Sequence, residues 1–301
     1  MPSKIQVAAI LGAVAASVNA HGHLSDLKVD GTEYEAYDPS FQFQNPAPEV
    51  IQWGCADCLD NGFVDPSMYG DVDKIACHKS AVTGAKVAKV AAGGTVDLTW
   101  NTWPESHVGP VIDYMAKVDD ATTAKAADLQ FFKIDEAGYE GGEWAATKLI
   151  NNDLTWSVTV PSSIAPGQYV LRHEIIALHS AGQPNGAQNY PMCINLEVTG
   201  SGTETPAGVT ADKLYTATDP GISVNIYGGD LSGYKIPGPA LFSGASSGSG
   251  SGNSSVASPA AGDEGALPEK FTLETFVAWL EKAAGSSSST KARRQAVAFR
   301  G

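Results

Sequence analysis

A histidine follows directly after a segment typical of a secretory signal peptide. Lys4 gives the positive end of that segment, an apolar stretch runs from Ile5 to Val14, and Val18-Asn19-Ala20 is a small-residue cleavage site. Cleavage after Ala20 makes His21 the first residue of the secreted chain. Such a residue offers a metal ion both its free α-amino nitrogen and a ring nitrogen, whereas an internal histidine offers only the ring. His21 is therefore a candidate metal ligand.

Further side chains that could serve a metal site occur in three later segments, which are Trp103–Val111 with His107, Leu171–His179 with His179, and Gln188–Cys193 with Gln188 and Tyr190. Gln188 and Tyr190 are two residues apart, so in an extended strand they face the same side. Three nitrogen donors in a plane suit Cu(II), and copper forms the strongest complexes in the divalent series. The α-amino group has an ordinary pKa of about 7.7–8.0, low enough for copper to displace its proton.

The composition favours a secreted protein that acts on a neutral or cationic partner. The chain has 301 residues and a net charge of -14. The last segment, 285–301, is basic, so the acidic charge is concentrated in the preceding body. An acidic body repels nucleic acid and anionic membranes, and we expect neither as a partner. After residue 20, no apolar run approaches the ~20 residues that a membrane-spanning helix needs. We expect an extracellular monomer.

Four cysteines in an exported chain predict two disulfides. Three pairings are possible, and we favour Cys77–Cys193 together with Cys55–Cys58. The alternative interpretation of Cys55-Ala-Asp-Cys58 is a redox or zinc motif. We disfavour it because export oxidises the pair and no second pair of cysteines is left to complete a zinc site.

The body of the chain is expected to be all-β. Residues Leu154–Val160 and Val96–Trp100 alternate apolar and polar side chains, and Tyr169–Leu178 and Met192–Val198 are further strand candidates. Clusters of Gly, Pro, Asn and Asp break these runs. Many short strands with long connections predict an antiparallel, immunoglobulin-like or fibronectin-like β-sandwich with long loops. No helical periodicity of similar strength occurs before residue 266.

The composition changes near residue 243, which suggests a division into five segments. These are a signal peptide (1–20), a folded body (21–242), a Ser/Gly-rich linker (243–265), a short amphipathic helix (266–284) and a disordered basic tail (285–301). The linker contains Asn253-Ser254-Ser255, a sequon that predicts glycosylation at Asn253. The helix is too short to form a domain by itself.

The four segments, taken in order behind a cleavable signal, resemble the fungal lytic polysaccharide monooxygenases of auxiliary activity family 9, once classed as glycoside hydrolases. The resemblance covers roughly residues 21–242. It implies one copper ion per chain, bound by the amine and ring of His21 and by the ring of His107, with Tyr190 at a distant axial position. It also implies that His179 and Gln188 contact oxygen species near the metal, and that Cys77 pairs with Cys193.

The same resemblance implies a secreted enzyme that oxidatively cleaves cellulose or a related β-1,4-glucan. It would use dioxygen or hydrogen peroxide and an external electron donor. A flat, uncharged sugar face favours exposed aromatic side chains, and Tyr234 matches a family segment whose tyrosine often lies on the binding surface. Two alternatives stay open: a glycoside hydrolase, with Glu105 and Glu174 as candidate carboxylates, and a non-catalytic protein that binds copper or carbohydrate. The Cys55–Cys58 pair departs from many family members.

Overall fold

The computed structural model describes residues 22–60 and 62–244. Several predicted features therefore lie outside the described residues: the signal peptide, His21, Asn253, most of the 243–265 linker, the 266–284 helix and the basic tail. The folded body is described almost completely.

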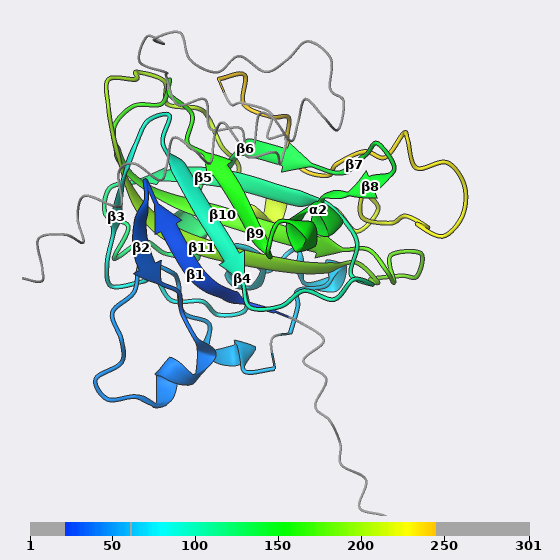
Figure 1. Cartoon of the computed structure of the whole chain (residues 1–301), viewed down its shortest axis with the longest axis horizontal. Helices are drawn as coiled ribbons and strands as arrows, with labels where there is room; N and C mark the ends of the chain where they lie inside the picture. The colour runs from blue at the N-terminus through cyan, green and yellow to red at the C-terminus, as the bar shows by residue number, and fades with distance from the viewer. Residues whose placement is uncertain (1–21, 61, 245–301) are drawn as a thin grey trace, which may run out of the picture. The chain divides into compact units, whose positions relative to one another are not determined.

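The body is a sandwich of two β-sheets that face each other (Figure 1). One sheet has the order β2-β1-β4-β9, the other has the order β3-β11-β10-β5-β6, and β7 and β8 form a separate hairpin. Within the part of the chain that the structure describes, the strands are β1 (Leu24–Val29), β2 (Thr32–Glu35), β3 (Ala88–Ala91), β4 (Thr95–Trp100), β5 (Val111–Val118), β6 (Phe132–Ala137), β7 (Tyr139–Glu140), β8 (Glu143–Trp144), β9 (Thr155–Thr159), β10 (Gly167–Ala177) and β11 (Gln188–Thr199).

Helices are short and lie in the connections between strands. The longer one, α2, follows the β7–β8 hairpin and is seven residues long. The helical elements are α1 (Val72–Ile75) and α2 (Ala145–Asn151), with 3-10 turns η1 (Pro39–Phe43), η2 (Ala56–Cys58), η3 (Pro66–Met68), η4 (Ala126–Asp128) and η5 (Ala211–Lys213). No helix within residues 22–60 and 62–244 combines the length and apolarity needed to cross a membrane.

The predicted β-sandwich is confirmed, and the strand candidates fall on β4, β9, β10 and β11. Burial in β9 alternates along the strand, as expected for one face on the core and one on solvent. The β10–β11 pair and its neighbours are antiparallel, whereas β3 pairs parallel with β11. Strand β11 begins four residues earlier than its apolar pattern suggests, because Gln188 already pairs with Ala177 of β10. That earlier start puts Gln188 and Tyr190 on one strand.

Two apolar clusters hold the fold together. The larger fills the space between the sheets and includes Trp100, Trp156 and Tyr190. The second lies on the outer face of the five-stranded sheet, beneath long loops, and includes Trp53, Trp144 and several other aromatic residues. Strand β10 is central to this sheet and is buried on both faces along most of its length. Its polar side chains must therefore find partners inside the protein.

Arg172 of β10 is paired with Glu174, which lies two residues further along the same strand face. Both side chains are fully buried, and the guanidinium makes two hydrogen bonds of 2.7 and 2.8 Å to the carboxylate. Arg172 also donates to the carbonyl oxygens of Ile75 and Ala76. Asn189 and the Tyr215 hydroxyl donate to Glu174. The network ties the loop around Ile75 to the centre of the sheet.

The two predicted disulfides are both present. Cys77–Cys193 joins the segment after α1 to the middle of β11 across 116 residues, which restricts the unfolded chain strongly. Cys55–Cys58 closes the short η2 turn. Described residues contain no free cysteine.

The Arg172–Glu174 pair yields a stability prediction. Glu174→Ala leaves the Arg172 charge buried without its counterion, so we expect a loss of about 3–5 kcal/mol in the free energy of unfolding. Chemical denaturation of the purified protein measures this.

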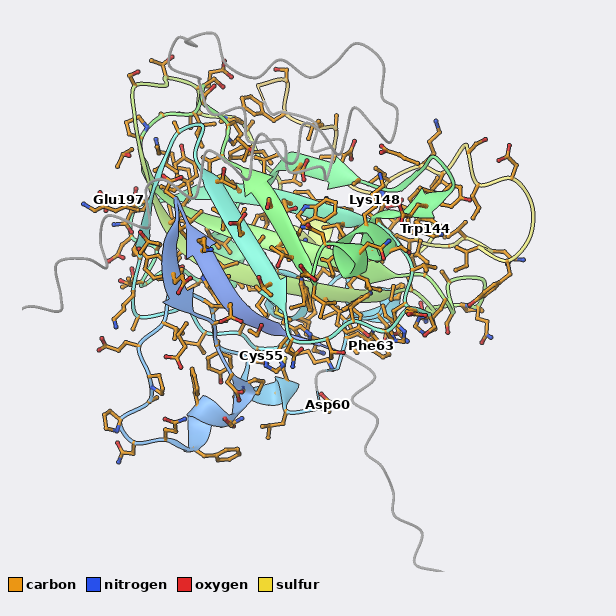
Figure 2. All side chains as sticks on the ribbon, in the orientation of Figure 1. Cys55, Asp60, Phe63, Trp144, Lys148 and Glu197 are labelled. Carbon is orange, nitrogen blue, oxygen red and sulfur yellow. A yellow bond between two sulfur atoms is a disulfide. The ribbon has the colours of Figure 1, made fainter. Side chains whose placement is uncertain are left out.

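Glu197→Ala is the matched control, because Glu197 lies at the surface 3.7 Å from Lys89 (Figure 2). An exposed pair of this kind contributes about 0–1 kcal/mol, so this variant should change little. Equal losses in the two variants would contradict the prediction.

Candidate metal centre

His107 is held on a loop that docks onto the end of β10. The His107 amide donates to the carbonyl of Pro104, and the Trp103 indole donates to the His107 carbonyl, which together fix the turn. Gly109 then passes so close to β10 that a Cβ there would lie 1.9 Å from the Ile176 oxygen. Only glycine permits this approach. The His107 side chain is 8% exposed, at the edge of the core.

His179 lies beside His107 as a direct result of this docking. The Leu178 amide donates to the Val108 carbonyl at 2.9 Å and the Ile176 amide donates to the Pro110 carbonyl, so the two segments run antiparallel. His107, which precedes Val108, therefore lies opposite His179, which follows Leu178. The ring centroids of His107 and His179 are 4.1 Å apart, with an interplanar angle of 34°. Two imidazoles from segments about seventy residues apart in sequence therefore meet at one place.

Tyr190 and Gln188 complete the group from β11. The Tyr190 hydroxyl donates to Gln188 Oε1 at 3.0 Å, which confirms that the two side chains share a strand face. The Trp103 ring packs edge-on against the Tyr190 ring and the His107 ring, with ring centroids 5.0 Å and 6.0 Å apart. Trp103 thus sets the spacing between His107 and Tyr190.

The Tyr190 phenol is kept in its protonated form by its surroundings. Burial raises the pKa of Tyr190, and the negative charge of Asp60 raises it further. Phe63 packs against Tyr190 with ring centroids 6.2 Å apart, and the Val64 segment bridges to Asn189. Figure 2 shows Asp60 and Phe63 along one edge of the molecule. A protonated phenol remains a donor to Gln188.

The N-terminal segment runs next to the loop that carries His107. His23 donates its amide to Asn101 Oδ1 and accepts from the Asn101 amide through its carbonyl. A Cβ on Gly22 would lie 2.0 Å from the Thr102 oxygen, so glycine is required there too. His21, the predicted first ligand, lies outside the described residues. It is nevertheless bonded to Gly22, which lies against the strand end that leads into Trp103.

The remaining histidines have other surroundings. His173 is fully buried: its Nε2 accepts from the Trp100 indole, and Nδ1–H donates to Asp113 at 2.7 Å. His78 is also buried and contacts the Cys55–Cys58 disulfide. Both ring nitrogens of His173 are therefore satisfied inside the protein.

Tyr234, the predicted substrate contact, is only partly exposed. Its hydroxyl donates to the Gly221 carbonyl at 2.9 Å, and its ring packs edge-on against Trp144. Tyr227, which the sequence did not single out, is 77% exposed. Its segment is anchored beside the chain that follows His179, where the Val224 amide donates to the Ala181 carbonyl. No sequence pattern distinguishes Tyr227, whereas Trp103 stands inside the His107 segment and could have been noted as a packing residue.

The donors gathered here fit copper by their chemistry. Ser106 Oγ lies 3.1 Å from His107 Nδ1, so Nε2 is the ring nitrogen on the side away from that hydroxyl. Divalent copper binds readily to a set of groups made of an imidazole nitrogen, the nitrogens of a chain terminus and a nearby phenol. The buried Trp103 ring and the partly buried Phe63 ring would hold these ligands in place.

The chain is similar to known proteins of one family. The model of Auxiliary Activity family 9 (formerly GH61) matches residues 21–234. A lytic polysaccharide monooxygenase B of this family from Aspergillus tamarii is 52% identical over 250 residues, covering 81% of this chain and 67% of its own length. A monooxygenase A from Malbranchea cinnamomea is 52% identical over 257 residues, covering 82% and 76%.

Solved structures agree with the sequence relatives. The extended catalytic domain of H. jecorina LPMO9A superposes with a TM-score of 0.74 at 48% identity, covering 78% of this chain and 96% of that one. The chain therefore belongs to auxiliary activity family 9, the family expected from its motifs. It shares the family's β-sandwich, and the family consists of copper-dependent polysaccharide monooxygenases.

Proposed function

We propose that this chain is a secreted copper monooxygenase that oxidatively cleaves cellulose or a related β-1,4-glucan, with an external electron donor and with dioxygen or hydrogen peroxide as co-substrate. One observation supports it above all: the His107 and His179 rings lie 4.1 Å apart beside the Tyr190–Gln188 pair, next to the N-terminal segment. Family membership makes this group of residues the candidate active centre.

His21 and His107 are the proposed copper ligands, the former through its amine and ring. Tyr190 would lie beside the bound copper. Bound copper would supply the one-electron redox chemistry that activates the co-substrate. The Ser106 contact orients the His107 ring, and the Trp103 contacts hold both His107 and Tyr190. Because ligands and neighbours are fixed before the reaction, little reorganisation is needed during turnover.

Gln188 and His179 are proposed to act on the co-substrate. Gln188 Oε1 accepts from the Tyr190 hydroxyl, so the Gln188 amide group keeps its two N–H donors for an oxygen atom near the metal. Burial raises the pKa of the Tyr190 phenol, which favours the protonated form that donates to Gln188. His179 is half-buried and beside His107, so its ring is the nearest candidate to deliver or hold a proton.

The substrate surface is proposed to include Tyr227. A neutral glucan matches the acidic charge of the chain better than an anionic polymer does. Tyr227 is exposed on the segment anchored next to the residues that follow His179, so an aromatic face is offered near the proposed copper site. Tyr234 is tied to Gly221 and Trp144, which favours a supporting role in this loop over a direct one.

One of the two candidate carboxylates of a hydrolase, Glu174, is not available to a substrate. Glu174 is fully buried and engaged by Arg172, Asn189 and Tyr215, so it does not reach a sugar at the surface. Glu105 is exposed on the His107 loop but then lacks Glu174 as a partner. Hydrolysis by two carboxylates needs both groups within roughly 5–9.5 Å of each other.

Product analysis tests the proposed function. The secreted protein should begin at His21 by N-terminal sequencing, because the amine ligand exists only after cleavage. With cellulose, copper and a reductant, mass spectrometry should show lactones, aldonic acids or ketoaldoses. Without reductant these products should be absent. Native sugar ends alone would support a hydrolase, and no products under any condition would support a binding protein.

Two substitutions separate metal binding from turnover. His107→Ala should lower copper affinity severely, since it removes one of three proposed nitrogen ligands. Gln188→Ala should keep copper bound and lower the turnover rate by about 10–100-fold, because it removes only a contact around the metal. Calorimetry with copper and product assays measure the two effects. Equal loss of copper affinity in both variants would refute the assignment.

Substitution of two tyrosines should distinguish substrate binding from loop stability. Tyr227→Ala should weaken retention on insoluble cellulose with little change in melting temperature, because the side chain is exposed. Tyr234→Ala should lower the melting temperature, since it removes a ring packed on Trp144 and a hydrogen bond. Pull-down on cellulose and thermal unfolding of both variants check this. Unchanged retention in Tyr227→Ala would exclude it from the binding surface.

A further inference from the structure

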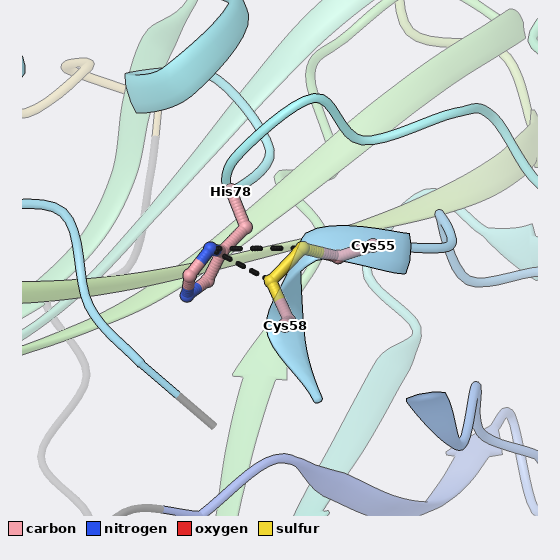
Figure 3. A group of neighbouring side chains, drawn as sticks. All are labelled: Cys55, Cys58 and His78. Atoms are coloured by element: carbon pink, nitrogen blue, oxygen red, sulfur yellow. Dashed lines mark hydrogen bonds between the residues drawn. A yellow bond between two sulfur atoms is a disulfide. The ribbon is translucent and has the colours of Figure 1, made fainter. Parts of the chain in front are cut away.

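A second cluster of metal-binding atoms lies around the Cys55–Cys58 disulfide. His78 Nδ1 is 3.0 Å from Cys58 Sγ and 3.8 Å from Cys55 Sγ (Figure 3). The two sulfurs and a ring nitrogen of His78 all lie within 4.8 Å of one another, and all three residues are buried. None of the three belongs to the proposed copper centre of His21 and His107.

The His78 ring is held in the tautomer that a metal ligand needs. Its Nε2 lies 2.9 Å from the Gly62 carbonyl oxygen, which can only accept, so Nε2 carries the proton. The lone pair is therefore on Nδ1, the nitrogen that faces the sulfurs, where it accepts from the Lys79 amide at 2.9 Å. A carbonyl behind the far nitrogen is the usual arrangement for a histidine bound to a metal. A metal–nitrogen bond would replace the local contact with Lys79.

Polar atoms of Lys79 and His78 lie next to the two sulfurs of the pair. Cys55 Sγ is 3.2 Å from the Lys79 carbonyl oxygen, and Cys58 Sγ faces His78 Nδ1. After reduction the two sulfurs must move apart, and the Cys55 S–H group then has the Lys79 carbonyl oxygen as a nearby acceptor, while a Cys58 S–H group would compete with the Lys79 amide for His78 Nδ1. Ala56, Asp57 and Leu59 around the pair are exposed, so the η2 turn lies at the surface, where a small reductant can approach.

The donor set and the cavity select the metal. Cysteines at positions i and i+3 on a tight turn form a common chelate, and soft thiolates with one imidazole favour Cu(I). A cavity of about 20 Å³ lined by these three residues also contains Met192, whose thioether is another soft donor. A cavity of this size has room for a single small ion or water molecule. Zinc would need a fourth ligand, whereas Cu(I) is satisfied by three.

We propose that Cys55, Cys58 and His78 form a second metal site, for Cu(I), which becomes available once a dithiol has reduced the disulfide. The dithiol donates two electrons and two protons: the Cys55–Cys58 bond breaks, two thiols form, and the reductant leaves as its cyclic disulfide. Binding of Cu(I) then releases one proton from each thiol, and the copper keeps its oxidation state.

Anaerobic titration of the secreted full chain tests this. One sample is kept oxidised, and another is treated with dithiothreitol, freed of reductant and assayed for thiols, with two per chain expected. Both are titrated with Cu(I) against a chromogenic Cu(I) chelator. The reduced chain should take up one equivalent more than the oxidised chain and gain an ultraviolet thiolate-to-copper band.

Matched variants assign the extra equivalent. The extra Cu(I) equivalent should disappear in Cys55→Ser/Cys58→Ser. In His78→Gln the affinity for that Cu(I) should fall by about tenfold or more. In His107→Ala the extra equivalent should persist, which separates this site from the proposed copper centre. Reduction that yields no thiols, equal copper uptake by both samples, or an extra equivalent that survives in the double cysteine variant would each overturn the proposal. The comparison of oxidised and reduced wild-type chain decides the matter even where a variant folds poorly.

Discussion

The candidate centre depends on the close approach of one loop to the end of one strand. Leu178 and Ile176 donate their amides to the carbonyls of Val108 and Pro110, and the gap between the two backbones leaves no room for a side chain at Gly109. This contact decides how far His107 lies from His179. A larger residue at position 109 would move the loop away from β10, and the two rings would separate although neither histidine had changed.

Strand β10 keeps its position because side chains on both of its faces are hydrogen-bonded to other parts of the protein. On one face, Arg172 and Glu174 join the strand to the Ile75 loop, to Asn189 and to Tyr215. On the other, His173 bridges Asp113 of β5 and the Trp100 indole of the opposite sheet. Buried polar groups with complete sets of partners restrict a structure to one arrangement. The sheet that supports the centre is therefore rigid close to it.

The sequence predicted the parts of the site that local pattern controls. Alternation of apolar residues identified the strands, and the two-residue spacing of Gln188 and Tyr190 predicted their common face. The contacts that depend on distant segments could not be predicted. Nothing near Trp103 indicates that its ring reaches Tyr190, nothing near Tyr234 indicates that Trp144 covers it, and nothing near His78 indicates that its ring meets Cys58. Each of these depends on how loops pack after the sheets have formed.

Strand β11 is contacted by several segments that are distant in the sequence. Strand β11 pairs with β10 and β3, and Gln52 and Val64 form isolated β-bridges to it. It also carries Cys193, the second cysteine of the long disulfide. In a chain exported from its N-terminus, Cys77 emerges more than a hundred residues before its partner. Cys55 and Cys58 emerge together and can pair with each other at once. If the Cys55–Cys58 bridge closes first, neither of its thiols can compete for Cys77, and Cys193 is the partner that remains.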